Sequence, residues 1–88
     1  MLEYHAAYYK QDSGWYVVNL IDFPGVNSQG RTLKSARRMI RDALRTMADW
    51  HMQEGQPLPK PKPRAKDKNA VLIETIRLVA RTECGANS

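Results

Sequence analysis

The hydrophobic period of this chain changes at Gly30, and that change limits the folds the chain can adopt. Residues 2–10 alternate in side-chain type, and residues 14–21 are rich in β-branched and aromatic side chains, which is typical of strands. After Gly30, apolar residues recur at intervals of three and four, as on one face of a helix. These apolar positions are Leu33, Ala36, Ile40, Ala43 or Leu44, Met47, and Trp50 or His51. The sequence therefore predicts an α+β domain in which a small antiparallel sheet packs against one helix.

The first thirty residues predict three strands joined by tight turns. A short polar link ending in glycine separates 2–10 from 14–21, which is the pattern of a β-hairpin. Residues 22–25 interrupt the strand pattern, because proline has no backbone N–H for a sheet and glycine permits a positive φ. Residues 26–29 follow as a third short strand. We expect these segments to form an antiparallel meander.

A helix is predicted over 32–53. Thr32 is suited to the N-cap, because its hydroxyl can accept a hydrogen bond from a backbone N–H of the first turn. Ser35, three residues later, is not the Glu or Gln of a capping box, so we expect a simple cap. Gly55 can adopt the left-handed conformation that closes a helix.

The remainder of the chain completes one small domain. We expect residues 1–54 to form the βββα core and residues 55–69, which contain four of the five prolines and several lysines, to form an extended linker. Residues 70–80 are rich in Val, Leu and Ile and predict a final strand of the same domain. A helix remains the alternative there, because apolar residues also recur at helical spacing. Residues 81–88 are a small, polar tail.

Composition excludes several classes of protein. Hydrophobic residues make up 42% of the chain and charged residues 26%, which fits a globular domain rather than a disordered one. Apolar runs reach only four residues, far short of the ~20 needed to cross a bilayer, so we expect no membrane span. The first ten residues have neither a basic leader nor a long apolar stretch, so we expect no secretory signal. The single cysteine, Cys84, cannot form an internal disulfide, so a reducing cytoplasm is the expected compartment.

Few residues offer catalytic or metal-binding chemistry. A two-metal nuclease needs several converging carboxylates, and nothing in the sequence brings its early acidic residues together. Neither a metal motif nor a glycine-rich phosphate loop is present in the sequence. We therefore expect no enzyme activity and no cofactor. The candidate groups are Glu3, Asp12, Asp22, His5, His51 and Cys84.

Three of these groups have ordinary structural interpretations. His5 lies in the middle of a predicted strand and is expected to be half-buried in the sheet. His51 is expected to cap or edge the helix. Asp22 opens a predicted turn, so we expect its carboxylate to bond to nearby backbone.

Positive charge is concentrated on the predicted helix. The net charge is +5, and four cations at intervals of three and four, with a fifth alongside them, share the helix face away from the apolar positions. We name them the basic stripe: Lys34, Arg37, Arg38, Arg41 and Arg45. The stripe is either a solvated outer face or a contact surface for phosphates or an acidic partner, and the linker lysines could extend it. The aspartates at 42 and 49 could offset the repulsion through i,i+4 pairs.

A series of motifs over residues 2–59 resembles the HicB-like antitoxin family. The motif positions are Asp22, Phe23, Pro24, Gly25, Val26, Gln29, Gly30, Thr32, Leu33, Ala36, Arg41, Ala43, Leu44 and the Gly55–Pro59 exit. The resemblance implies a partial RNase H-like fold of order β-β-β-α-β. It also implies a non-catalytic protein that binds and neutralises a small HicA-type mRNA-cleaving toxin.

Two features depart from the family pattern. The family helix is usually acidic, whereas the basic stripe occupies this one, so pairing with a basic toxin would bring like charges together. The stretch after the linker is too short for the helix-turn-helix that longer family members use on DNA.

The sequence leaves two alternative functions open. The chain could be a nucleic-acid-binding module that contacts RNA or DNA through the basic stripe and the linker, or, by fold analogy alone, a nuclease. We also expect a homo-oligomer, a dimer or a tetramer, because one helix leaves a sheet face and the sheet edges uncovered.

Overall fold

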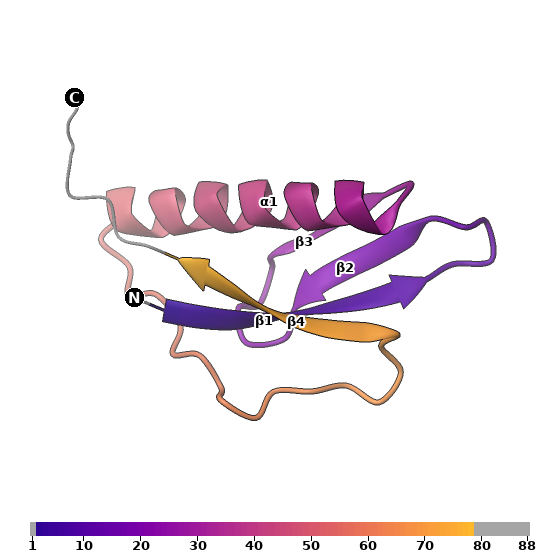
Figure 1. Cartoon of the computed structure of the whole chain (residues 1–88). Helices are drawn as coiled ribbons and strands as arrows, with labels where there is room; N and C mark the ends of the chain where they lie inside the picture. The colour runs from indigo at the N-terminus through magenta and orange to yellow at the C-terminus, as the bar shows by residue number, and fades with distance from the viewer. Residues whose placement is uncertain (1, 79–88) are drawn as a thin grey trace.

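Four strands and one helix follow one another in the order β-β-β-α-β in the computed structural model, which describes residues 2–78 (Figure 1). The elements are β1 (Leu2–Lys10), β2 (Tyr16–Leu20), β3 (Asn27–Gly30), α1 (Leu33–Gln53) and β4 (Leu72–Leu78). The predicted α+β class and the element order are confirmed. Residues 79–80, the predicted tail 81–88 and its Cys84 lie outside the described residues.

The strands form one antiparallel sheet in the order β3-β2-β1-β4. β4 returns to pair with β1 along its whole length, with Tyr4 opposite Ile76 and Ala6 opposite Glu74. The last apolar segment is therefore a strand, and its helical alternative is wrong. Figure 1 shows α1 lying across one face of the sheet while β1 and β4 run side by side below it.

Two predicted strands are displaced by their turns. β2 begins at Tyr16 rather than at residue 14, because Gly14 has a φ of +95° and belongs to the turn. It also ends before residue 21. β3 spans Asn27–Gly30 rather than 26–29, since Val26 closes the turn by accepting a 3.0 Å hydrogen bond from the Leu20 N–H.

The helix is capped more completely than its sequence predicts. The Ser35 N–H donates to Thr32 Oγ1 at 3.0 Å, and the Thr32 N–H donates to Ser35 Oγ at 3.1 Å. These reciprocal bonds form a capping box, so the expectation of a simple cap is wrong. The Ser35 hydroxyl accepts the hydrogen bond from the N-cap N–H that a Glu or Gln side chain usually accepts at this position. At the other end, Gly55 takes a φ of +68° and the helix closes as predicted.

The core lies between the helix and the sheet face that it covers. α1 buries Ala36, Ile40, Leu44 and Ala48, each four residues from the next. They pack on the aromatic and β-branched side chains of the strands and of the turn before β3. Of the two alternatives predicted for the last apolar position, Trp50 is 49% exposed, whereas His51 packs edge-on against the Phe23 ring. The core residues are Tyr4, Ala6, Tyr8, Val18, Leu20, Phe23, Val26, Ala36, Ile40, Leu44 and Ile76.

The helix approaches one side of the sheet much more closely than the other. A Cβ at Gly30 would lie 2.5 Å from the backbone nitrogen of Ala36, so glycine is required where β3 meets the first turn of α1. From there α1 packs mainly over β3 and β2 and meets β4 only sparsely. The β4 side of the covered sheet face is therefore partly open.

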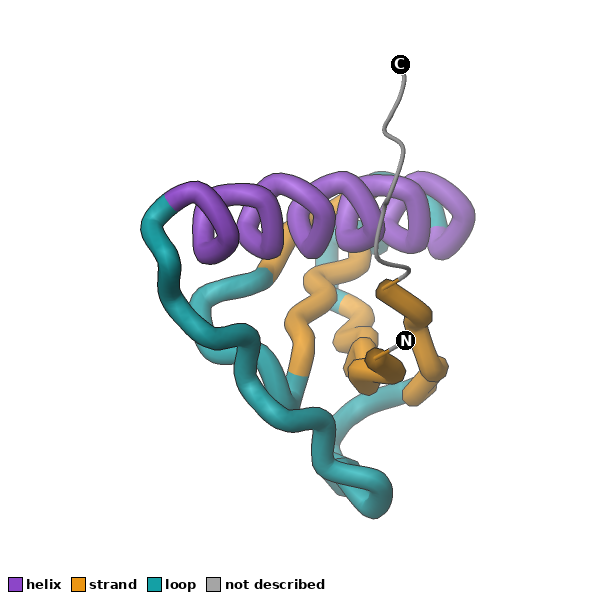
Figure 2. The backbone as a smooth tube through the Cα atoms, turned by 90° about the vertical axis from the view of Figure 1, so that its left-hand side faces the viewer, coloured by secondary structure: helices purple, strands orange, loops and turns teal. Residues whose placement is uncertain are grey.

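Residues 55–69 connect the helix to β4, and we name them the strap. Figure 2 shows this segment descending from the end of α1, passing beyond the sheet and returning to the start of β4. It contains neither helix nor strand. Tyr4 donates its hydroxyl to the Pro59 carbonyl at 2.7 Å, and Tyr9 donates to the Asp67 carboxylate at 2.6 Å. The strap is thus held on the sheet by strand side chains.

Candidate functional site

Four members of the basic stripe point into solvent without ion pairs. Lys34, Arg38, Arg41 and Arg45 are exposed, and none forms a salt bridge within residues 2–78. The i,i+4 aspartates therefore do not engage them as ion pairs. A surface pair of this kind contributes little, since holding two long side chains together costs entropy. This leaves their positive charge available to a partner.

Arg37, the fifth member, is engaged inside the fold. Its guanidinium donates to the Glu74 carboxylate from Nε at 3.0 Å and from Nη2 at 2.6 Å. These bonds join α1 to β4, and they lower the pKa of Glu74 despite its partial burial. The structure thus separates Arg37 from the four free cations.

A buried tyrosine lies beneath this ion pair. The Tyr8 hydroxyl is shielded from solvent and has no hydrogen-bond partner by geometry among the described residues. Burial and the neighbouring Glu74 carboxylate raise the pKa of Tyr8 to about 12. The phenol therefore stays protonated at neutral pH and supplies no base.

The Asp22 carboxylate links three parts of the chain, namely its own turn, β1 and the strap. Its carboxylate is buried and accepts hydrogen bonds from the His5 N–H at 2.8 Å, from His5 Nδ1 at 2.9 Å and from the Lys62 N–H at 3.0 Å. Burial alone would raise the pKa of Asp22, but the bonds from His5 and Lys62 together hold it below its ordinary value. His5 is half-buried, as predicted.

The predicted role of Asp22 needs correction. Its carboxylate bonds to β1 and to the strap rather than only to the backbone of its own turn. The partners lie 17 and 40 residues away, so no local sequence signal could identify them. His51 lies at the helix end as expected, with Nδ1 3.3 Å from the Pro57 carbonyl oxygen.

The other motif residues are structural. Phe23 fills the core, and Gly25 takes a φ of +90° in the turn that Pro24 shapes. Leu33 packs against the core at the start of α1, and Ala36 meets Gly30. Together these positions join β2, β3 and the helix.

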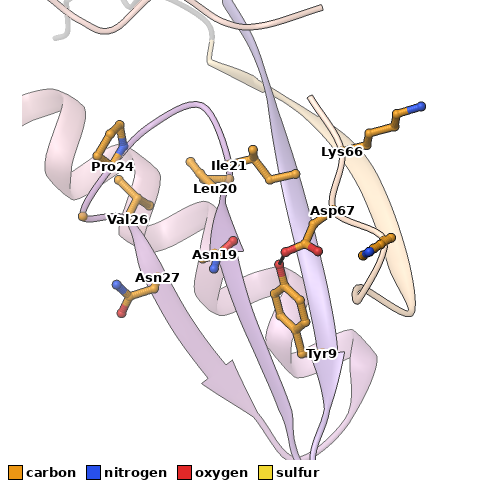
Figure 3. A pocket seen from close by; sticks show the side chains of 11 residues that line it. Tyr9, Asn19, Leu20, Ile21, Pro24, Val26, Asn27, Lys66 and Asp67 are labelled. Carbon is orange, nitrogen blue, oxygen red and sulfur yellow. Dashed lines mark hydrogen bonds between the residues drawn. The ribbon is translucent and has the colours of Figure 1, made fainter. Parts of the chain in front are cut away.

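A shallow polar pocket of about 530 Å³ lies between the turn before β3 and the strap. Figure 3 shows Tyr9 and Asp67 joined across one side of it, with Pro24, Val26 and Asn27 on the other side. Its hydrogen-bonding groups are tyrosine, asparagine, lysine and one aspartate. Among residues 2–78, no three His, Cys, Asp or Glu side chains come together as metal ligands would.

A larger groove of about 970 Å³ lies between the second half of α1 and β4. Its apolar lining is Leu2, Leu44, Ala48, Met52, Leu58, Ile76 and Leu78. Two of the free stripe cations, Arg41 and Arg45, line its helix side. On the strand side, Arg77 donates to Glu3 at 3.0 Å. No local pattern in the sequence predicts this groove, because the groove depends on how β4 pairs with β1.

Comparison with known proteins identifies the family. Residues 3–78 match the family described as the HicB_like antitoxin of bacterial toxin-antitoxin systems. The chain therefore belongs to the HicB-like antitoxin family. Among its relatives, Antitoxin HicB of Escherichia coli strain K12 is 34% identical over 50 residues, which cover 57% of this chain and 36% of that protein.

Two further comparisons support this placement. The UPF0150 protein of Thermoplasma acidophilum is 30% identical over 59 residues, covering 67% of this chain and 86% of that protein. The crystal structure of the N-terminal domain of Burkholderia pseudomallei antitoxin HicB superposes with a TM-score of 0.77 at 21% identity, covering 90% of this chain and all of that one. The fold is thus that of the HicB N-terminal domain.

The match to Escherichia coli HicB spans only about a third of that protein's length.

Within the described residues, α1 lacks the combination of length and apolar character that a membrane-spanning helix requires.

Proposed function

We propose that this chain is an antitoxin that binds a small HicA-type mRNA-cleaving toxin and neutralises it by direct contact, without catalysis of its own. The observation that carries the proposal is the family match over residues 3–78. We further infer that the fold is a partial RNase H-like domain and that the protein acts in the cytoplasm, where its target would cleave mRNA.

The chemistry of the described residues is consistent with a binding role. The buried carboxylate of Asp22 is occupied by three hydrogen bonds, and that of Glu74 is occupied by Arg37. Both carboxylates are thus engaged in holding the fold together. In contrast, the four unpaired stripe cations and the groove between α1 and β4 offer surfaces to a partner.

Co-expression tests this proposal. The chain is produced together with a HicA-type toxin from the same host, and growth and co-purification are followed. We expect growth to be restored and a stable complex to be recovered. An Ile40→Asp variant, whose buried charge should unfold the core, serves as the control that loses both effects. Growth arrest that persists with abundant folded wild-type chain would contradict the proposal.

Nucleic-acid binding is a second candidate function, favoured by the four unpaired stripe cations. Lys34, Arg38, Arg41 and Arg45 could contact phosphates, and such binding weakens steeply as salt rises because counterions are released. Fluorescence anisotropy with a labelled 20-nucleotide RNA and with duplex DNA, over a salt series, measures this. Affinity that is absent, or that does not change with salt, would exclude it.

We also propose a homo-oligomer, a dimer or a tetramer, formed through the sheet face opposite α1. Val17 and Ile73 lie on that face and are only partly buried. Multi-angle light scattering at two protein concentrations tests the assembly. A monomeric mass at both concentrations would contradict it.

A further inference from the structure

β4 forms the longer of the two edges of the sheet. The sheet order places β3 and β4 at its two edges, and β3 has four residues whereas β4 has seven. Native proteins protect exposed edges by keeping them short or by placing charges and prolines on them. β3 follows this rule. β4 carries no proline, its two charged residues Glu74 and Arg77 are each ion-paired within the fold, and Thr75 between them is exposed.

The hydrogen-bond pattern identifies which β4 backbone groups are free. The Ile21 N–H donates to the His5 carbonyl, so the backbone groups of His5 point toward β2. Because these directions alternate along a strand, Tyr4 and Ala6 point toward β4. Their partners there are Ile76 and Glu74, which must point back toward β1.

By the same alternation, the intervening residues Ile73, Thr75 and Arg77 direct their N–H and C=O groups to the open edge. They form an evenly spaced row that another extended chain could pair with.

An apolar surface adjoins this row of backbone groups. The groove beside β4 contains Leu44 and Ala48 from α1 and Ile76 and Leu78 from β4. Side chains that project from one face of an added strand would enter it, since alternate residues of a strand share a face. An apolar residue at every second position of the ligand would therefore be buried.

The charges that line the groove indicate which polar groups a ligand should carry. Arg41 and Arg45 line the groove and form no salt bridge within residues 2–78, whereas Arg77 is already paired with Glu3. Asp49 is the one other charged residue of the lining, so positive charge still predominates on the helix side. Carboxylates on the ligand would complement the two free guanidiniums. A second copy of this chain would instead bring another pair of arginines to the same place, and a nucleic acid would leave the apolar lining unfilled.

We propose that β4 and its groove bind an extended acidic segment of a partner protein. The segment adds a strand to the edge at Ile73, Thr75 and Arg77, places alternate apolar side chains in the groove and directs carboxylates to Arg41 and Arg45. This surface does not depend on the proposed neutralisation of a toxin, because the partner is defined here by its sequence chemistry alone.

A displayed library of random 12-residue peptides tests the proposal with the purified chain. We expect the selected peptides to alternate apolar residues with Asp or Glu. Hydrogen exchange of the complex should protect the amides of Ile73, Thr75 and Arg77, while the amide of Ile76, already bonded to β1, changes little. Peptides without this pattern, or binding that leaves the three edge amides unprotected, would overturn the proposal.

Matched variants separate the two parts of the surface. Thr75→Pro removes an edge N–H without removing a bond to β1 and should abolish binding, whereas Thr75→Ala keeps the N–H and should preserve it. Arg41→Glu with Arg45→Glu should weaken binding about tenfold or more, because two attractions become repulsions. Lys34→Glu with Arg38→Glu makes the same charge change outside the groove and should leave affinity unchanged.

Each variant is first checked for a native circular dichroism spectrum and thermal transition. If the two double variants weaken binding equally, the stripe acts as a general electrostatic surface and the groove proposal fails. If the library yields binders only in the form of the chain's own β4 sequence, the occupant is a second copy, and the acidic-partner proposal is wrong.

Discussion

The two halves of α1 have different relations to the sheet. At its beginning, the backbone meets β3 so closely that Gly30 can carry no side chain, and Thr32 and Ser35 fix the first turn. In its second half, the β4 side of the same helix lines an open groove with free arginines. Leu44 and Ala48 of this half are nevertheless buried, so both halves secure the fold and only the β4 side of the later turns presents a surface. Substitutions on the buried and on the exposed sides of the helix should therefore differ in their cost to stability.

Ile40→Ala should be the most destabilising change. Ile40 is fully buried at the centre of α1, so truncation removes apolar contacts and leaves a cavity, costing about 2–5 kcal/mol of unfolding free energy. Urea titration measures the loss. Met39→Ala, at the neighbouring exposed position, is the control and should change stability by less than about 0.5 kcal/mol. Equal losses would mean that the buried and exposed faces of α1 are misassigned.

Gly30→Ala tests the close approach at the start of the helix. The added Cβ would lie 2.5 Å from the Ala36 nitrogen, so β3 and α1 must separate, at a cost of about 2–3 kcal/mol. Gly14→Ala provides the contrast, because nothing lies within 4 Å of that Cβ and only the strained φ is affected. Thermal denaturation compares the two, and a Gly30→Ala variant as stable as wild type would refute the tight contact.

Asp22→Asn should weaken the attachment of the strap. An amide nitrogen cannot accept the bonds that the carboxylate takes from His5 and Lys62, so we expect a loss of about 1–3 kcal/mol. Asp12→Asn, in the exposed β1–β2 turn, should be neutral. Chemical denaturation with backbone amide exchange in the strap gives the readout. Unchanged exchange around residue 62 would show that Asp22 does not hold the strap.

The pH dependence of stability should reflect the same carboxylate. The pKa of Asp22 is below its ordinary value of 3.8 in the folded chain, so the unfolded chain binds the proton more readily. The stabilisation is complete above that ordinary value and declines as the pH falls through the lower folded pKa. Stability measured between pH 5 and pH 2 should fall less steeply in Asp22→Asn than in wild type, and parallel curves would contradict this.

Arg38→Ala should have the smallest effect. The side chain is exposed and forms no salt bridge in the described part of the chain, so its loss should change stability by less than about 0.5 kcal/mol. Arg37→Ala is the informative partner, because it removes the bidentate bond to Glu74 and should cost more. The same denaturant titration ranks the two, and the reverse order would contradict the separation of Arg37 from the free cations.

Local periodicity predicted β1 and α1 and their buried faces, but it left the last segment open between a strand and a helix. The alternation in β1 and the four-residue spacing of Ala36, Ile40 and Leu44 each describe one element and its buried face. Thr32 and Gly55 mark the helix ends through backbone chemistry that depends only on their neighbours. These signals need no knowledge of the rest of the chain.

Long-range contacts could not be predicted in the same way. The pairing of β4 with β1 brings Glu74 to Arg37, 37 residues earlier, and creates the groove. The ties from Asp22 and Tyr9 to the strap likewise join residues that are far apart. Trp50 and His51 both fit the helical spacing, but Trp50 is 49% exposed whereas His51 meets Phe23. The sequence therefore indicates the candidate binding surface only through the positive charges on the helix.

The most direct test of the central claim is a titration of the purified chain into a purified HicA-type toxin from the same host, with cleavage of a defined RNA as the readout. We predict that cleavage falls in proportion to added chain and stops at a fixed molar ratio, while the chain alone leaves the RNA intact. Cleavage that continues undiminished in a large excess of folded chain would show that it is not an antitoxin for that enzyme.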